Sequence, residues 1–196
     1  MKYFDTKLKE AFIRICTYGY EAGWHERNGG NLSYRMKEEE VAEIKEYLNE
    51  DTEWLEIGTS VPDLKNEYFM VTGSGKYMHN VATAFEDSVA IVKVNEDGTK
   101  YKIVYGLVNG GKPTSELPTH LMNLEVLKNR DPEMRVVYHS HPQNIIALTF
   151  VLPLDEEVFT REIWEMMTEC PIIFPKGIGV VEWMVPGGRE IAVKTC

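Results

Sequence analysis

The chain has 196 residues, a length typical of one domain. Its 21 Lys and Arg residues against 31 Asp and Glu residues give a net charge of −10. Such an acidic surface argues against nucleic acid and anionic membranes as partners, since both require a basic face. No apolar run reaches the roughly 18 residues of a spanning helix. The start of the chain has no apolar signal region. Its three cysteines are too few and too scattered for a disulfide framework, so we expect a cytoplasmic protein.

Apolar spacing and turn residues predict the following elements in chain order. The first half is expected to hold a helix over about 6–24, a strand over 32–35, a helix over 38–50, a strand over 68–72 and a hairpin of strands 89–94 and 101–108. The second half is expected to hold a helix over 115–128, a strand over 135–140, helices over 144–150 and 159–169, and strands over 171–174 and 178–183. Hairpins among packing helices predict an α/β fold with a mainly antiparallel sheet covered by helices. No linker divides the chain, so residues 1–196 are expected to form a single domain.

Two histidines two residues apart, His139 and His141, lie at the end of the predicted strand over 135–140 and directly after it. Residues two apart on a strand point to the same face, about 7 Å apart, so both imidazoles can converge on one metal ion. Histidine is the commonest ligand for zinc-like cations at neutral pH. Spacing alone leaves two interpretations open, a metal site or two unoccupied histidines on a half-exposed strand. A zinc site needs a third ligand, and no histidine follows His141.

An acidic residue, Glu116, is expected in the first turn of the helix over 115–128. Thr114 or Ser115 can cap that helix, and the free N–H groups of a helix start attract anions. Glu116 is then either a catalytic carboxylate or an ordinary acid whose negative charge interacts favourably with the positive end of the helix dipole. His120, one turn later, is expected to be a buried or supporting histidine rather than a ligand.

Two glycine-rich loops are the third chemical signal. One is Asn28-Gly29-Gly30-Asn31 and the other is Gly73-Ser74-Gly75-Lys76. Such loops can form anion-binding nests of backbone N–H groups, and Lys76 adds a charge suited to phosphate. Each loop taken alone is more often a simple turn. Metal ligands, a carboxylate base and phosphate-binding loops together indicate metal-assisted aldol cleavage.

Several segments resemble the class II, zinc-dependent aldolases of sugar phosphates. They are residues 23–32 (GWHERNGGNL), 71–76 (VTGSGK), 113–118 (PTSELP), 139–142 (HSHP) with 144–149 (NIIALT), 159–161 (FTR), 168–170 (TEC) and 183–187 (WMVPG). They run in the family's order from about residue 23 to residue 191. The GSGK and TEC segments are most similar to the rhamnulose-phosphate branch. This resemblance implies the family's fold, a central sheet with helices on both sides.

The resemblance also implies a role for each matching residue. His139 and His141 are expected to be two of three zinc ligands, with Zn²⁺ as the cofactor. Glu116 is expected to be the catalytic carboxylate, and Glu169 a further acid that reaches a neighbouring subunit's site. The dihydroxyacetone phosphate cradle is expected to consist of Asn28, Asn31, Ser74, Gly75, Thr114 and Ser115. A homo-oligomer, most simply a tetramer, is expected.

The chain departs from the family at its end. Family members continue past the position of Cys196, and their third zinc histidine lies in that continuation. Residues 1–196 are therefore expected to form a class II aldolase domain that lacks the family's C-terminal portion and one zinc ligand.

The implied activity is reversible cleavage of L-rhamnulose 1-phosphate to dihydroxyacetone phosphate and L-lactaldehyde through a zinc-stabilised enediolate. Two alternatives stay open. One is another enzyme of the same fold, a fuculose-phosphate aldolase or a ribulose-phosphate 4-epimerase. The other is a metal-free fragment or interaction module without catalysis.

Overall fold

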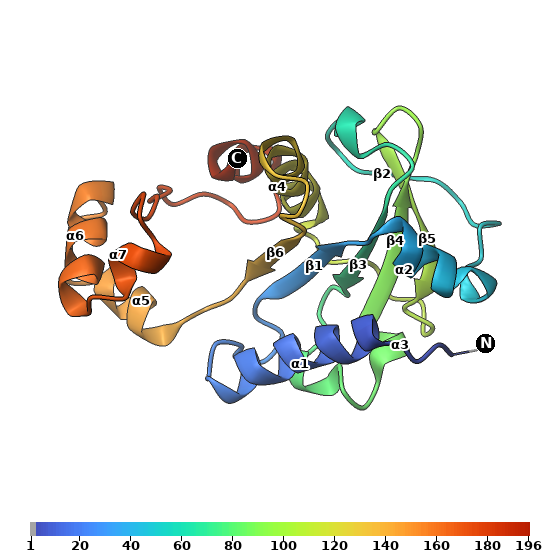
Figure 1. Cartoon of the computed structure of the whole chain (residues 1–196), viewed down its shortest axis with the longest axis horizontal. Helices are drawn as coiled ribbons and strands as arrows, with labels where there is room; N and C mark the ends of the chain where they lie inside the picture. The colour runs from blue at the N-terminus through green and yellow to red at the C-terminus, as the bar shows by residue number, and fades with distance from the viewer. Residues whose placement is uncertain (1–2) are drawn as a thin grey trace. The chain divides into compact units, whose positions relative to one another are not determined.

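The fold is built on one six-stranded sheet, seen in the computed structural model, which describes residues 3–196 (Figure 1). Every pair of neighbouring strands is antiparallel, and the strand order is β2-β5-β4-β3-β1-β6. The strands are β1 (Asn31–Arg35), β2 (Leu55–Glu56), β3 (Tyr68–Thr72), β4 (Val89–Val94), β5 (Lys100–Gly106) and β6 (Val136–His139). The predicted antiparallel α/β class is confirmed.

The chain divides into two compact units, residues 1–141 with 185–196, and residues 142–184. The first unit holds the sheet, the helices α1 (Lys7–Glu21), α2 (Glu38–Glu43), α3 (Phe85–Ser88), α4 (Leu117–Arg130) and α8 (Arg189–Thr195), and the 3₁₀ turns η1 (Lys45–Tyr47), η2 (Pro62–Leu64) and η3 (Met78–Asn80). The second unit holds α5 (Gln143–Leu148), α6 (Glu156–Met166) and α7 (Cys170–Ile173). Among residues 3–196, none of these helices is long and apolar enough to cross a membrane.

Helices cover both faces of the sheet (Figure 1). On one face, Phe12 and Cys16 of α1 pack in a buried cluster with Met70 of β3. On the other face, Leu121 of α4 packs in a second cluster with Val71, the next residue of β3. Successive residues of a strand point to opposite faces, so each face needs its own helix. The central strands are consequently apolar on both faces, and β4 is buried along nearly its whole length.

Helix boundaries follow local hydrogen bonds. Thr6 caps α1, because its hydroxyl accepts a hydrogen bond from Lys9 N at 3.2 Å. The helix predicted over 38–50 is wrong in its second half, since α2 ends at Glu43 and one 3₁₀ turn follows. After that turn the chain joins the sheet, where Asn49 N donates to Val104 O of β5 at 2.8 Å.

The two strands predicted over 171–174 and 178–183 are wrong. Residues 170–173 form α7, and residues 178–183 have no regular structure. The N–H groups of Ile172 and Ile173 bond back to Glu169 O at 3.1 and 3.0 Å, and Pro171 suits the first turn of a helix. A short apolar run does not by itself distinguish a strand from a helical turn. All strands of the described residues belong to the first unit, so this run finds no strand partner in its own unit.

Candidate active site

Three strand termini lie side by side along one edge of the sheet, meaning the edge where strands begin and end rather than an outer strand. Asn31 opens β1, His139 closes β6, and these two residues are paired across the antiparallel ladder. Thr72 closes β3 on the other side of β1, and its hydroxyl accepts a hydrogen bond from Leu32 N at 3.1 Å. Antiparallel pairing thus places the start of one strand beside the ends of its two neighbours.

The segment before α4 joins this edge through backbone contacts. Gly73 pairs with Pro113 in an isolated bridge. Thr114 N donates to Thr72 O at 2.9 Å, and Ser74 N donates to Lys112 O at 2.8 Å. The loop after β3 therefore lies directly beside the segment that leads into Glu116.

Helix α4 begins later than the sequence predicts. Its first residue is Leu117, so Glu116 stands at the N-cap rather than in the first turn. No side chain caps the helix, and Thr114 instead accepts a hydrogen bond from Glu116 N at 3.2 Å through its hydroxyl. Pro118 falls in the first turn, where its missing N–H costs nothing. The expected cap by Thr114 or Ser115 is therefore wrong, because the Thr114 hydroxyl forms a tight turn with Glu116 instead.

The Glu116 carboxylate lies between two polar partners. Its Oε2 is 2.8 Å from Nδ1 of His139 and accepts a hydrogen bond from Nδ2 of Asn31 at 3.0 Å. The contact with His139 lowers the pKa of Glu116, burial raises it, and the Asn31 bond lowers it further, to about 2. Glu116 is thus an ionised, largely buried carboxylate held at the end of β6.

The two histidine rings lie side by side, with centroids 4.9 Å apart. They face different carboxylates. His139 faces Glu116, whereas Nδ1 of His141 lies 2.6 Å from Oε1 of Glu26. The backbone N–H of His141 donates to Trp24 O at 2.8 Å, which ties the end of β6 to the segment before the first glycine loop.

The donor set fits part of a zinc site. Nδ1 of His139 is buried and has no hydrogen-bond partner of acceptable geometry, although Glu116 is close. Two adjacent imidazoles, one with an unpartnered nitrogen, are suitable ligands for zinc. Within residues 3–196, however, no group of three or more His, Cys, Asp or Glu side chains is arranged to hold a metal ion. The described residues thus supply two zinc ligands without a third.

The residues expected to hold phosphate come from three segments at this sheet edge. Asn31 and Thr114 are buried, while the remaining four are exposed: Asn28, Ser74, Gly75 and Ser115. The backbone N–H groups of Ser74 and Thr114 are engaged by carbonyl oxygens. Recognition of an anion here would therefore depend on side-chain hydroxyl and amide groups more than on a backbone nest.

Lys76, expected to attract phosphate, forms an ion pair instead. Its Nζ lies 2.8 Å from Oδ2 of Asp87, whose other oxygen accepts a hydrogen bond from Nδ2 of Asn109. The positive charge is neutralised within the fold, which sequence spacing did not reveal because Asp87 is 11 residues away.

Two buried histidines lie near the site: His120, which the sequence predicts to be buried or supporting, and His25, to which no role is assigned from the sequence. His120, only 1% exposed, contacts Ser33 and Asn31. His25, 3% exposed, contacts Gly29 O through Nδ1 at 3.0 Å and the Tyr138 hydroxyl through Nε2. Burial lowers the pKa of both imidazoles, to about 4 for His120. The sequence feature that could have pointed to these histidines is their position. His25 precedes the first glycine loop, and His120 follows Glu116 by one helical turn.

Glu169 lies in the second unit of the chain. It is exposed and stands at the N-cap of α7, where its Oε2 accepts a hydrogen bond from the Thr168 hydroxyl at 3.3 Å. Its expected role at a neighbouring subunit's site stays a prediction.

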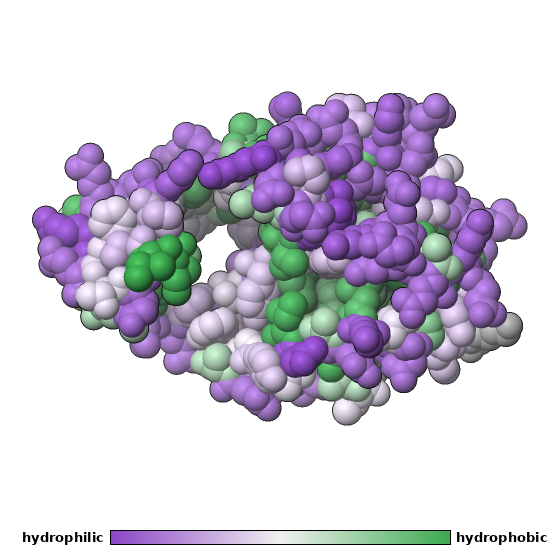
Figure 2. Space-filling view, viewed as in Figure 1, coloured by the Kyte–Doolittle hydropathy of each residue, from purple (hydrophilic) through white to green (hydrophobic). Residues whose placement is uncertain are grey.

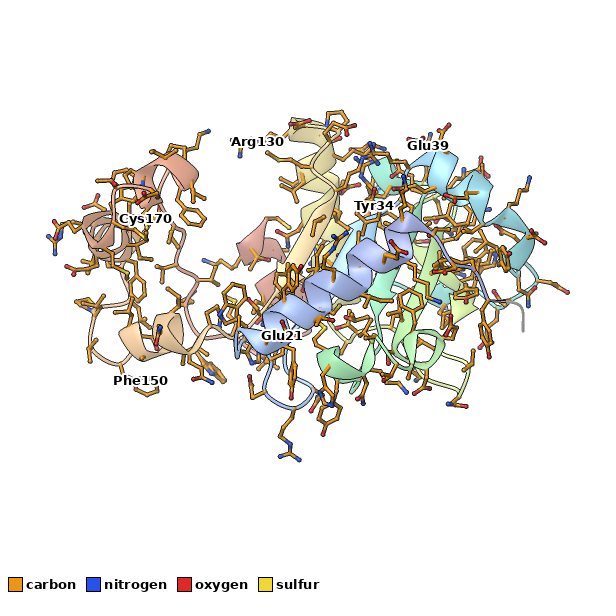
Figure 3. All side chains as sticks on the ribbon, turned by 60° about the horizontal axis from the view of Figure 1, so that its bottom comes forward. Glu21, Tyr34, Glu39, Arg130, Phe150 and Cys170 are labelled. Carbon is orange, nitrogen blue, oxygen red and sulfur yellow. The ribbon has the colours of Figure 1, made fainter. Side chains whose placement is uncertain are left out.

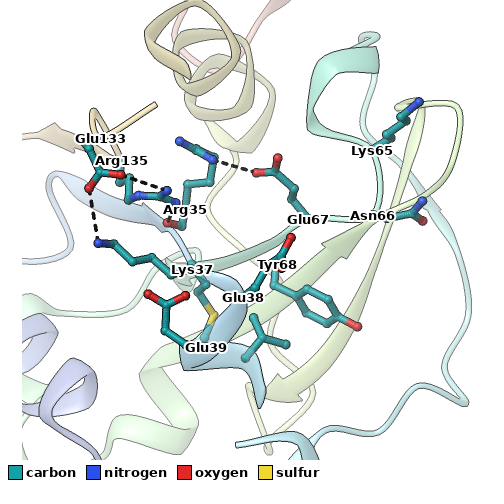
Figure 4. A pocket seen from close by; sticks show the side chains of 12 residues that line it. Arg35, Lys37, Glu38, Glu39, Lys65, Asn66, Glu67, Tyr68, Glu133 and Arg135 are labelled. Atoms are coloured by element: carbon teal, nitrogen blue, oxygen red, sulfur yellow. Dashed lines mark hydrogen bonds and ion pairs between the residues drawn. The ribbon is translucent and has the colours of Figure 1, made fainter. Parts of the chain in front are cut away.

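A separate cleft of about 640 Å³ lies at the opposite end of β1 (Figure 4). Five of its charged side chains form ion pairs with one another. Arg35 pairs with Glu67 at 3.2 Å, and Glu133 pairs with both Lys37 and Arg135, at 3.3 and 3.5 Å. These contacts join β1, the start of β3 and the segment before β6, so we assign the cleft a structural role.

Comparisons with known proteins agree with this site. The family described as "Class II Aldolase and Adducin N-terminal domain" matches residues 10–195. The chain is 49% identical over 174 residues to a rhamnulose-1-phosphate aldolase of Mannheimia succiniciproducens, covering 88% of this chain and 64% of that protein. It is 41% identical to a rhamnulose-1-phosphate aldolase of Enterococcus faecalis, covering 100% of this chain and 70% of that protein.

A solved structure is also similar. The sugar-phosphate aldolase from Thermotoga maritima superposes with a TM-score of 0.78 at 31% identity, covering 97% of this chain and 77% of that one. The chain spans about two thirds of the length of the curated relatives that it matches. Because the family match covers nearly the whole chain and the antiparallel sheet agrees with it, this chain belongs to the class II aldolase and adducin N-terminal domain family.

Proposed function

We propose that this chain forms the catalytic domain of a lyase that cleaves L-rhamnulose 1-phosphate reversibly to dihydroxyacetone phosphate and L-lactaldehyde. The observation that carries the proposal is the ionised carboxylate of Glu116, held between Asn31 and His139 in a chain 41–49% identical to proteins named rhamnulose-1-phosphate aldolase. The relatives are longer than this chain, so the activity is proposed for the whole protein.

Glu116 is the proposed proton carrier at C3. Loss of the C4 hydroxyl proton to a base, for which Glu169 is the proposed group, breaks the C3–C4 bond, releases L-lactaldehyde and leaves an electron pair on C3. Glu116, after it takes up a proton from water, delivers that proton to C3 and gives dihydroxyacetone phosphate, and in the synthetic direction the same carboxylate removes it. Glu169 is the proposed second acid for proton transfer.

The phosphate is proposed to bind along the edge formed by the two glycine loops and the segment before α4. The proposed contacts come from Asn28, Asn31, Ser74, Gly75, Thr114 and Ser115. The Thr114 hydroxyl accepts a hydrogen bond from Glu116 N, which leaves its own proton free to donate to phosphate. Binding the non-reacting end of the substrate orients the C3–C4 bond at Glu116.

Zn²⁺ is the proposed cofactor. His139 and His141 would hold it, and the third protein ligand would come from outside the described residues. When bound, zinc supplies a Lewis acid that polarises the ketose carbonyl.

The protein is further proposed to be a cytoplasmic homotetramer that acts in rhamnose degradation. The three cysteines are free and no described helix could cross a membrane, which are both compatible with that compartment.

Substrate profiling tests the proposal against its rivals. Purified protein supplied with zinc is given L-rhamnulose 1-phosphate, L-fuculose 1-phosphate and L-ribulose 5-phosphate, and the release of dihydroxyacetone phosphate or the epimerised product is measured. Preference for L-rhamnulose 1-phosphate is expected. Preference for either of the other substrates would replace the proposal with another enzyme of the fold. A full-length parent that turns over none of them would support the non-catalytic alternative.

A further inference from the structure

Three buried polar side chains form a continuous chain of contacts that ends on the half-buried Glu116. The Ser33 hydroxyl lies 2.5 Å from Nδ1 of His120, and Nε2 of His120 contacts Oδ1 of Asn31. Nδ2 of Asn31 then donates to Oε2 of Glu116 at 3.0 Å. Ser33 and His120 are almost fully buried, so water cannot replace any of their contacts.

The direction of each hydrogen bond follows from the amide of Asn31. Nδ2 of Asn31 donates to Oε2 of Glu116, so its NH₂ group faces Glu116. The amide oxygen of Asn31 then faces His120, and because a carbonyl oxygen only accepts, Nε2 of His120 must carry a proton. A neutral imidazole with a protonated Nε2 has a bare Nδ1, so the Ser33 hydroxyl must donate to it.

We infer that His120 and Ser33 are positioning residues, which lock Asn31 with its NH₂ group toward Glu116 by a one-directional chain of hydrogen bonds. This inference rests on the proposed function only for its catalytic consequence, since the direction of the chain is a property of the fold. Burial lowers the pKa of His120, which agrees with a neutral ring.

The reverse arrangement of donors and acceptors is unfavourable because it sets two acceptors against each other. If Nδ1 of His120 carried the proton, Nε2 would need a donor and Asn31 would have to turn its NH₂ group toward the ring. The amide oxygen of Asn31 would then face the carboxylate oxygen of Glu116 at 3.0 Å, an acceptor against an acceptor. The tautomer of His120 therefore reports how Asn31 is oriented.

The deciding experiment measures that tautomer in the whole 196-residue chain. Long-range ¹H–¹⁵N correlation spectra of the ¹⁵N-labelled protein at neutral pH, with His120 assigned by the His120→Gln variant, are expected to show a protonated Nε2 and a bare Nδ1. The side-chain amide protons of Asn31 are expected to move upfield in Glu116→Gln, because the donor then faces a neutral amide. A protonated Nδ1, or an imidazolium, would overturn the inference.

Kinetics test the catalytic consequence with a matched pair of variants. His120→Gln places an amide near the position of Nε2 and is expected to retain most of the cleavage rate. His120→Asn places its amide near Nδ1, cannot reach Asn31, and is expected to lose about 10–100-fold in kcat. Asn123→Ala, one turn further along α4, is the control and is expected to match the parent.

Failure of the inference and failure of the proposed function are distinguishable. A full-length, zinc-supplied protein whose His120 has the expected tautomer but which cleaves no sugar phosphate would contradict the proposed function alone. Equal rates for His120→Gln and His120→Asn in folded proteins would show that His120 does not position Asn31 for catalysis.

Discussion

At the scale of single residues, the site depends on one carboxylate with an unusual environment. Glu116 is mostly buried, yet the contacts with His139 and Asn31 lower its pKa to about 2. It is therefore ionised at neutral pH, which is the form that accepts a proton in the synthetic direction, whereas in cleavage it must first take up the proton that it delivers to C3.

Replacement of this carboxylate tests its role as a proton carrier. Glu116→Gln keeps the shape and an acceptor for Asn31 but removes the proton acceptor. Cleavage is expected to fall by about 10²–10⁴-fold, with KM changed less. Initial rates of dihydroxyacetone phosphate release in the presence of zinc provide the measurement. The control is Glu39→Gln, an exposed residue at the opposite end of β1. A Glu116→Gln enzyme with near-normal kcat would contradict the assignment.

The number of zinc ligands sets a second expectation at this scale. Catalytic zinc sites usually have three protein ligands, and the described residues supply only His139 and His141. Loss of a direct ligand should weaken binding more than loss of a supporting partner, which costs about 10–100-fold. After dialysis the 196-residue chain is therefore expected to retain well under one zinc per chain, and His139→Ala and His141→Ala are expected to retain less.

Metal analysis of the dialysed proteins checks this. One zinc per chain that survives dialysis in the parent, and is unchanged in both alanine variants, would show that other residues hold the metal.

At the scale of elements, the first glycine loop packs tightly between His25, in the segment after α1, and the end of β6. Gly30 has a φ of +80°, which L-residues rarely adopt, and a Cβ there would clash with Nδ1 of His25 and lie 2.7 Å from His139 O. The loop position thus requires glycine both for its backbone conformation and for the close approach of the strand end.

A pair of alanine substitutions separates these two effects. Gly110 has the same φ of +80°, but a Cβ added there would have no other atom within 4 Å, so Gly110→Ala carries only the conformational cost of about 1–2 kcal/mol. Gly30→Ala adds overpacking, typically about 1–3 kcal/mol more. Urea unfolding is expected to rank the parent above Gly110→Ala and Gly110→Ala above Gly30→Ala. Equal losses in the two variants would contradict the tight packing at Gly30.

A cluster of ion pairs and hydrogen bonds around Glu50 holds the segment after η1 against the sheet. Oε2 of Glu50 lies 2.7 Å from Nζ of Lys102 and 3.1 Å from Nζ of Lys93, and the Tyr68 hydroxyl donates to Oε1. Burial raises the pKa of Glu50, but the bonds from Lys102, Tyr68 and Lys93 outweigh it and lower the pKa to about 2.

This lowered pKa predicts a pH-dependent stability. The folded chain holds the Glu50 proton less tightly than the unfolded chain, so the contribution is complete above about pH 4.5 and is lost as the pH falls toward 2. Because the carboxylate is 43% exposed, solvent screening limits it to about 1 kcal/mol or less. Glu50→Gln is expected to lower the free energy of unfolding at pH 7 and to match the parent near pH 2. A difference that persists at pH 2 would exclude ionisation as its cause, and Glu53→Gln, an exposed neighbour, is the control.

At the scale of the whole molecule, the second unit has few buried residues and many exposed apolar ones. Only Phe159 and Ile163 of α6 are buried in it, whereas Phe150, Ile172 and Trp183 are 84%, 77% and 85% exposed. Figure 2 shows hydrophobic groups on the surface of this unit, and Phe150 is labelled in Figure 3. Exposed apolar patches of this kind favour association.

Association in solution is the expected result. Light scattering of the 196-residue chain is expected to report an oligomer or larger species, and Phe150→Ser with Trp183→Ser is expected to shift it toward monomer. Phe159→Ser, a buried residue of the same unit, serves as the comparison because it should destabilise α6 without removing exposed apolar surface. A monomeric parent at concentrations used for structural work would contradict this expectation.

Much of the fold was predictable from local patterns. Short-range sequence patterns predict the strands over 68–72 and 89–94, the hairpin turn between β4 and β5, and the glycine loops. They do so because residue alternation and turn propensity act over short distances along the chain. The apolar run that forms α7 was not predictable in this way, since its conformation depends on whether a strand neighbour is present.

The antiparallel α/β class, the family resemblance and the set of side chains able to perform chemistry all follow from the order of the amino acids. Which of those side chains act together depends on how the folded chain packs. Asn31 meets Glu116 across 85 residues and His120 across 89, and Lys76 is neutralised by Asp87. Local periodicity carries no information on such pairs, because hydrogen-bond partners are chosen by where strand ends and helix starts meet after the sheet has formed.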